Sequence, residues 1–173
     1  VFITGRTVGS LGETTAGSYD VFLAKLDSTG AMDTSFGGGD GIAQLGDITI
    51  GSDANGGEYS RDIYVDASGN VYLAGETPGD LGETAGTSSD IFIAKFDSTG
   101  SLDTSFGSGN GIAQLGAVTM GPLANLVDNV SVLSADSSGN LFFAGHTSGS
   151  LGENSAGEYD AYIAQIDTSG TLM

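Results

Sequence analysis

The fold of this 173-residue chain can be inferred from the segment VYLAGETPGDLGET, at residues 71–84. It opens with an apolar run typical of a β-strand and continues into glycine, proline and acidic residues typical of a loop. The same pattern occurs as VFITGRTVGSLGET at residues 1–14 and as LFFAGHTSGSLGEN at residues 141–154. A pattern that returns at a fixed spacing indicates a repeat protein, in which each copy forms one structural unit.

The repeat has a period of 70 residues. Residues 1–70 align with residues 71–140 without a gap, and 37 of the 70 positions are identical. Residues 141–173 continue as a third, incomplete copy. We therefore expect one repeat domain over residues 1–173, made of two full copies and part of a third.

Each full period contains four strand signals separated by Gly, Ser, Asn and Asp. In the middle copy we expect strands over residues 62–66, 71–77, 90–97 and, roughly, 111–120. No segment of ten residues shows the 3.6-residue periodicity of an amphipathic helix. The sequence therefore predicts an all-β fold.

The central strands are apolar at successive positions, as in residues 71–74 and 91–94. Neighbouring residues of a strand point to opposite faces of the sheet, so both faces must be covered. A stack of similar sheets covers both faces, and four-stranded sheets repeated around an axis are the blades of a β-propeller. We expect tandem 70-residue blades of four antiparallel strands, about two and a half blades in all.

Two motifs carry a family resemblance. Asp-x-Ser-Gly-Asn followed by an apolar strand ending Ala-Gly-x-Thr occurs at residues 66–77 and 136–147, and an Asp-x-(Phe/Tyr)-Ile-Ala strand occurs at residues 90–100 and 160–170. These motifs resemble the bacterial β-propeller repeat family described from seven-bladed propellers. The resemblance implies a propeller fold, in large secreted or cell-surface bacterial proteins. The long period, 70 residues, departs from a usual blade.

The chain is too short to close a propeller ring alone. Rings have about 4–8 blades, which at 70 residues each needs roughly 280–560 residues. Two alternatives follow. The partners are further repeats of the same or a longer chain, or several copies form a homo-oligomer in which open strand edges pair between chains.

Composition excludes several functions. The chain has 22 acidic and 4 basic residues, a net charge of −18 and no cysteine. A nucleic-acid partner is excluded because binding phosphates requires many Lys and Arg side chains. Disulfide scaffolds and zinc–thiolate sites require cysteine. No apolar run is long enough to span a membrane, which needs about 18 residues.

The acidic residues beside the Gly-x-Leu-Gly-Glu loop are candidate calcium ligands. Carboxylates and backbone carbonyls are the oxygen ligands that Ca²⁺ prefers. The alternative is structural, with each Leu filling a gap between blades and each Asp bonding to its own turn. The candidates, with one residue from a later loop, are Glu13, Asp20, Asp53, Glu83, Asp90, Glu153 and Asp160.

One repeat position changes its charge from copy to copy: Arg6, Glu76 and His146. Because the chemistry varies while the surrounding motif is kept, we expect these side chains to face solvent and to form a ligand surface. His146 is the one histidine, and catalysis would require a nucleophile and an orienting carboxylate around it. We expect no catalytic residues.

Two further pairs of residues have both a structural and a functional interpretation. Phe36 and Phe106 in Asp-Thr-Ser-Phe-Gly either anchor their loop or stack on a sugar, and we favour the anchor. Lys25 and Lys95 are expected to pair with a neighbouring carboxylate. The leading interpretation is a non-catalytic secreted or cell-surface module with a structural, protein-binding or glycan-binding role. The alternatives are a self-assembling fibre or sheath subunit and a fragment of a propeller enzyme such as a glycan hydrolase or lyase.

Overall fold

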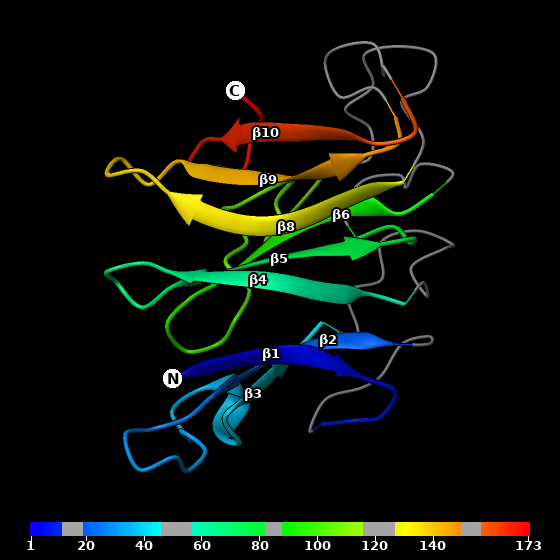
Figure 1. Cartoon of the computed structure of the whole chain (residues 1–173). Coiled ribbons are helices and arrows are strands. Elements are labelled where there is room, and N and C mark those ends of the chain that lie inside the picture. Colours follow the sequence, from blue (N-terminus) through cyan, green and yellow to red (C-terminus); the bar gives the residue numbers. More distant parts are fainter. Residues whose placement is uncertain (12–18, 46–56, 82–87, 116–126, 150–156) are drawn as a thin grey trace.

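The computed structural model is all-β and consists of three antiparallel sheets stacked on one another (Figure 1). It describes residues 1–11, 19–45, 57–81, 88–115, 127–149 and 157–173. Within these ranges there are ten strands, one three-residue 3-10 turn (η1, Gly37–Gly39) and no α-helix. The predicted fold class is therefore confirmed.

The middle sheet contains the four strands of one blade, in the order β4-β5-β6-β7. The first strand begins at Tyr59, three residues earlier than predicted, because Tyr59 pairs with Glu76 and a bulge at Arg61 absorbs the extra residue. The last strand is described over three residues only, and residues 116–120 of its predicted range lie outside the described residues. The strands are β4 (Tyr59–Val65), β5 (Val71–Thr77), β6 (Asp90–Phe96) and β7 (Ile112–Gln114).

The two outer sheets each contain three described strands of the same pattern. The first sheet has the order β1-β2-β3 and corresponds to strands two, three and four of the middle sheet. The third sheet has the order β10-β9-β8 and corresponds to strands three, two and one. Their strands are β1 (Phe2–Thr7), β2 (Asp20–Lys25), β3 (Ile42–Gln44), β8 (Asp128–Ala135), β9 (Leu141–Thr147) and β10 (Asp160–Ile166).

The tight turns are closed by aspartate side chains. Asp66 accepts hydrogen bonds from the backbone N–H groups of Ser68 (2.8 Å) and Asn70 (2.9 Å), and Gly69 adopts φ +84°. A side chain that bonds to the backbone two residues ahead fixes the turn, and glycine accepts the left-handed conformation without strain. Ordinary turn chemistry therefore accounts for this motif.

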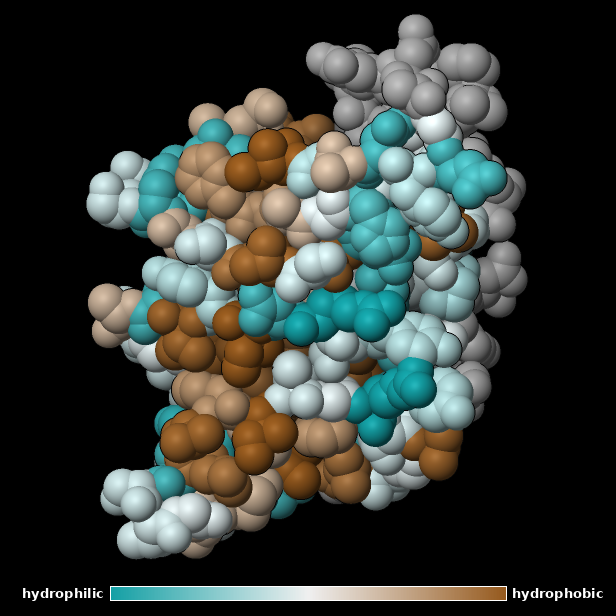
Figure 2. All heavy atoms as spheres, viewed as in Figure 1, coloured by the Kyte–Doolittle hydropathy of each residue, from teal (hydrophilic) through white to brown (hydrophobic). Residues whose placement is uncertain are grey.

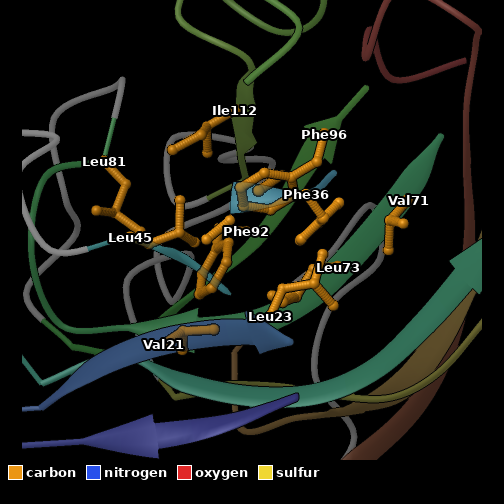
Figure 3. Close-up of a cluster of buried hydrophobic side chains, with 12 residues drawn as sticks. Val21, Leu23, Phe36, Leu45, Val71, Leu73, Leu81, Phe92, Phe96 and Ile112 are labelled. Atoms are coloured by element: carbon orange, nitrogen blue, oxygen red, sulfur yellow. The ribbon is translucent and has the colours of Figure 1, made fainter. Parts of the chain in front are cut away.

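Two apolar clusters hold the stack together. The first lies between the first and middle sheets and joins Val21 and Leu23 to Leu73, Phe92 and nearby side chains (Figure 3). The second joins the middle and third sheets. Because each cluster takes side chains from two sheets, both faces of the middle sheet are covered, as the apolar strands predicted. We call these contacts junction 1 and junction 2.

Phe36 and Phe106 are the anchors of these junctions. Both rings are 0% exposed, so the alternative of sugar stacking is wrong and the anchor is confirmed. The backbone next to each ring bonds to the following blade, with the Gly37 N–H donating to the Thr99 carbonyl at 2.8 Å. Gly37 has φ +62°, and a Cβ there would lie 1.9 Å from the Ile42 carbonyl oxygen, so only glycine fits.

Candidate functional site

The repeat position of Arg6, Glu76 and His146 has a different environment in each sheet. At junction 1, the Arg6 guanidinium lies 4.6 Å from the ring centre of Tyr19 and 4.4 Å from that of Tyr59. Tyr19 precedes β2, whereas Tyr59 belongs to β4 of the next sheet. Arg6 is exposed, as predicted, but its cation–π contacts join two blades.

Glu76 corrects the sequence prediction, because it is buried. Its carboxylate accepts hydrogen bonds from Arg61 Nε at 2.9 Å and from a second guanidinium nitrogen at 2.7 Å. This two-point contact keeps the Arg61 pKa above its usual value. Arg61 lies on the bulge of β4, so the neighbouring strand provides the partner that lets a charged residue be buried.

His146 holds the same repeat position in the third sheet, and its side chain is exposed. Its ring contacts the ring of Tyr159 edge-on, with 5.4 Å between centres, and Tyr159 is 61% exposed. An imidazole beside an exposed phenol offers a hydrogen-bonding group and an aromatic surface, which suits a polar ligand with an apolar face, such as a sugar. We call His146 and Tyr159 the His–Tyr surface.

The predicted calcium residues do not come together within the described part of the chain. Asp20 and Asp90 are buried, and each accepts a hydrogen bond from a glutamine in the last strand of its sheet. Asp20 accepts from Gln44 of β3 at 3.0 Å, and Asp90 accepts from Gln114 of β7 at 3.2 Å. Asp160 opens β10 and is half-buried. In the ranges described, no group of three or more His, Cys, Asp or Glu is arranged to hold a metal ion. Glu13, Asp53, Glu83 and Glu153 lie outside the described residues.

The two glutamines have a role that the sequence analysis missed. Gln114 Oε1 accepts a hydrogen bond from the Leu81 N–H at 2.7 Å, and Gln114 Nε2 donates to the Gly79 carbonyl at 2.9 Å. Gln44 likewise accepts from the Leu11 N–H at 3.0 Å. The repeated Ile-Ala-Gln-Leu segment was the available signal. In each of the two sheets the glutamine therefore holds the start of the Gly-x-Leu-Gly-Glu loop. Leu81 of this loop is buried in the apolar cluster of junction 1.

Two segments of the chain, residues 7–36 and 79–106, match a family model described as a domain of unknown function (DUF5122), beta-propeller. The segments occupy corresponding parts of two repeats and together make up about a third of the chain. The stacked antiparallel sheets and this match agree on the fold, which is that of β-propeller repeats. None of the curated proteins matches it.

Each blade junction of this propeller chain contains a buried carboxyl group where the first strand of the following blade begins. Glu58 and Asp128 hold the same repeat position, and each accepts a hydrogen bond from a threonine hydroxyl, Thr77 at 3.3 Å and Thr147 respectively. Burial raises the pKa of Glu58 to about 8 and that of Asp128 to about 6. Glu58 is therefore mostly protonated at neutral pH. The only available signal was the acidic residue before strand one.

The lysine prediction is confirmed in both propeller blades that carry the residue. Lys25 pairs with Asp33 at 3.1 Å and Lys95 with Asp103 at 2.8 Å. The hydrogen bond from Lys95, with those from Ser105, lowers the Asp103 pKa to about 2. These pairs hold the Asp-Thr-Ser-Phe-Gly loop against β2 and β6, which is a structural role.

No helix in the described ranges is both long and apolar enough to cross a membrane.

Proposed function

We propose that this chain is a non-catalytic propeller module with a structural or interaction role, in a bacterial protein that is secreted or displayed at the cell surface. One observation carries the proposal. A single repeat position, in three sheets of similar structure, is occupied by a basic, an acidic and an imidazole side chain: Arg6, Glu76 and His146. A frame that stays constant while one position varies is suited to presenting side chains to partners, because binding residues can change without loss of the core.

Among the three copies of this repeat position, the His–Tyr surface of the third sheet is the one that supports ligand binding. Arg6 and Glu76 are committed to contacts with neighbouring side chains, whereas His146 and Tyr159 are both exposed. The net charge of −18 disfavours anionic partners, so a neutral polysaccharide is the ligand class that this surface fits best. An aromatic side chain of this kind stacks on the apolar face of a sugar ring.

The test is binding of the chain to an array of neutral polysaccharides. We expect Tyr159→Ala to weaken binding about tenfold, the loss of roughly 1.4 kcal/mol, which is a typical aromatic contribution. Val8→Ala is the control, because Val8 is an apolar residue that is 71% exposed outside this surface. Equal binding by both variants contradicts the ligand surface. Release of reducing sugars from a bound polysaccharide contradicts the non-catalytic assignment and favours the alternative of an enzyme fragment.

Self-assembly is a second candidate function, and the strand order favours it. The described part of the third sheet ends at β10, where the middle sheet continues into β7. An uncovered strand edge presents backbone N–H and C=O groups that pair readily with another strand. A fibre or sheath subunit completed by such pairing would show a molar mass that rises with protein concentration, whereas a binding module without this property would stay at 17.2 kDa.

A further inference from the structure

Two tyrosine rings from neighbouring blades meet at junction 1. Tyr19 precedes β2 of the first sheet, and Tyr59 opens β4 of the middle sheet. Their ring centres lie 6.2 Å apart and their ring planes are inclined by 41°. Aromatic side chains at this separation are in contact, although these two lie far apart in the sequence. The contact is made between two blades of this chain, so it involves neither a further blade nor a second copy.

Backbone bonding and packing hold the two tyrosines in place. The Glu58 N–H donates to the Tyr19 carbonyl at 2.9 Å, so the residue before Tyr59 is bonded to Tyr19 itself. A Cβ on Gly57 would lie 3.2 Å from a carbon of the Tyr19 ring, which places the chain leading to Tyr59 against that ring. The Arg6 guanidinium lies over both rings. Groups that are held together in this way can react with each other without a large movement.

The tyrosine pair is open to solvent on one side. Both residues are half-buried. Figure 2 shows polar side chains gathered on the side of the visible face where β1 ends and β4 begins, and apolar ones on the other side. A half-buried phenol can give up an electron and a proton to an oxidant in the solvent, whereas a fully buried one is shielded from it.

The composition makes tyrosine the residue that could link blades covalently. The chain has no cysteine, so no disulfide can join them, and it has no tryptophan. A second close tyrosine pair, Tyr64 and Tyr72, consists of cross-strand neighbours in the middle sheet with ring centres 6.0 Å apart. A bond within that pair would join two strands of one blade. A bond between Tyr19 and Tyr59 would join two blades.

We propose that Tyr19 and Tyr59 form an oxidative cross-linking site, at which a dityrosine bond joins the first and middle blades. The oxidant is hydrogen peroxide used by a haem peroxidase, which removes one electron and one proton from each phenol. The two radicals couple through ring carbons next to the hydroxyl groups, and the hydrogens of those carbons move to the oxygens. Two tyrosines and one peroxide thus give one dityrosine and two molecules of water. The inference adds a modification to the proposed structural role and does not depend on the His–Tyr surface.

Junction 2 provides a comparison within the same molecule. The repeat positions of Tyr19 and Tyr59 are held there by Ser89 and Asn129. The backbone contact is equivalent, because the Asp128 N–H donates to the Ser89 carbonyl at 3.1 Å. The same backbone arrangement therefore carries two phenols at junction 1 and none at these positions of junction 2. We expect the oxidised chain to be linked across junction 1 alone.

The test is treatment of the whole chain, at low protein concentration, with a haem peroxidase and hydrogen peroxide, followed by tryptic digestion and mass spectrometry. Trypsin cleaves after basic residues, which are Arg6, Lys25, Arg61 and Lys95. Tyr19 and Tyr59 therefore lie in different peptides, residues 7–25 and 26–61. We expect these peptides to be joined with the loss of two hydrogen atoms, and the chain to acquire the fluorescence of dityrosine.

Two phenylalanine variants make the test specific. Tyr59→Phe keeps the ring but removes the hydroxyl group, and it should abolish the joined peptides. Tyr64→Phe is the matched control, because it makes the same change in the other tyrosine pair and should leave the joined peptides unchanged. Tyr64 and Tyr72 share one tryptic peptide, residues 62–95, so a bond between them cannot be mistaken for the proposed one. Unchanged circular dichroism shows that each variant is folded.

Oxidation of the unfolded chain and the stability of the linked chain complete the test. In concentrated urea the blades no longer meet, so the joined peptides should be lost. A link between residues 19 and 59 closes a loop in the unfolded chain and lowers its conformational entropy. The linked chain should therefore unfold at a higher urea concentration than the untreated one, and an unchanged midpoint would contradict a structural role for the bond.

Three results would overturn the cross-linking site. One is a folded, oxidised chain without the joined peptides, and another is joined peptides that persist in Tyr59→Phe. The third is dityrosine formed only between separate chains, seen as a doubled mass on a denaturing gel. Polysaccharide binding is measured separately with Tyr159→Ala, so failure of the cross-link leaves the proposed ligand role standing, and failure of binding leaves the cross-link standing.

Discussion

Junction 1 and junction 2 have equivalent apolar clusters but differ in the polar contacts at their edges, which we call the rims. Phe36 and Phe106 fill the same place in each. Around this frame, junction 1 uses Arg6 between two tyrosine rings, whereas junction 2 has a backbone N–H of Leu133 donating to Asp62 at 2.8 Å. We infer from this difference that burial of apolar area holds the blades together, while the polar contacts around it can vary because each contributes less free energy.

The largest expected effect comes from removing the anchor rings. Phe36→Ala and Phe106→Ala should each lower the free energy of unfolding by about 3–5 kcal/mol, because each leaves a cavity at a fully buried site. Urea denaturation followed by circular dichroism measures both losses. If the junctions are equivalent, the two losses agree within about 1 kcal/mol. A loss below about 1 kcal/mol in either variant would contradict the assignment of that ring as an anchor.

The buried carboxyl groups should separate the junctions by their pH dependence. The folded-state pKa of Glu58, about 8, lies above its ordinary value, so the folded protein holds a proton that the unfolded chain releases. Stability is therefore greatest below about pH 4.5 for this group, falls as pH rises, and levels off above about pH 8. For Asp128, whose pKa is about 6, the fall ends about two pH units earlier.

Glu58→Gln and Asp128→Asn test this pH dependence, since a neutral amide has no proton to release. We expect Glu58→Gln to be more stable than the unchanged chain at pH 8 by a few kcal/mol, since each pKa unit corresponds to about 1.4 kcal/mol. Asp128→Asn should gain less. Melting temperatures measured from pH 4 to pH 9 provide the comparison. Parallel curves for the unchanged chain and Glu58→Gln would show that the Glu58 pKa is not raised.

A smaller effect should distinguish Arg61 from Arg6. Arg61→Ala leaves the buried Glu76 carboxylate without its partner and should cost about 1–2 kcal/mol, because the half-exposed arginine site lets water replace part of the contact. Arg6→Ala removes cation–π contacts at an exposed site and should cost about 0.5–1 kcal/mol. The double variant Arg61→Ala/Glu76→Gln should recover part of the first loss. Chemical denaturation measures all three, and an equal loss for both arginines would contradict the difference between the rims.

Calcium should produce the smallest change. If the predicted ligands bind the ion, millimolar Ca²⁺ raises the free energy of unfolding by about 1.4 kcal/mol at ten times the dissociation constant. Differential scanning calorimetry in EDTA and in Ca²⁺ measures the shift, with Mg²⁺ as the control ion. Asp20 and Asp90 already accept glutamine hydrogen bonds, so their substitution should reduce the shift less than substitution of Glu13 and Glu83. An unchanged melting temperature would contradict calcium binding.

Much of the fold could be predicted from the sequence, because each decisive signal is local. The period of 70 residues, the apolar strands and the Asp–Gly turns depend on neighbours in the chain, and all four strands of the middle sheet were located. The anchor role of Phe36 and the pairing of Lys25 were also predictable, since both lie in a motif whose alternatives were few. The bulge at Arg61 had no local signal, and it moved the start of β4.

The repeating unit can be read from the sequence, whereas the contacts that each copy of a residue makes depend on how the blades pack. Arg6, Glu76 and His146 are equivalent in sequence, yet one lies between tyrosine rings, one is buried against Arg61 and one is exposed beside Tyr159. Ile93 and Ile163 likewise differ only in what the next sheet covers. Strand formation follows from local apolar patterning and turn chemistry, whereas burial and pKa depend on side chains that lie far away along the chain and meet only when blades stack.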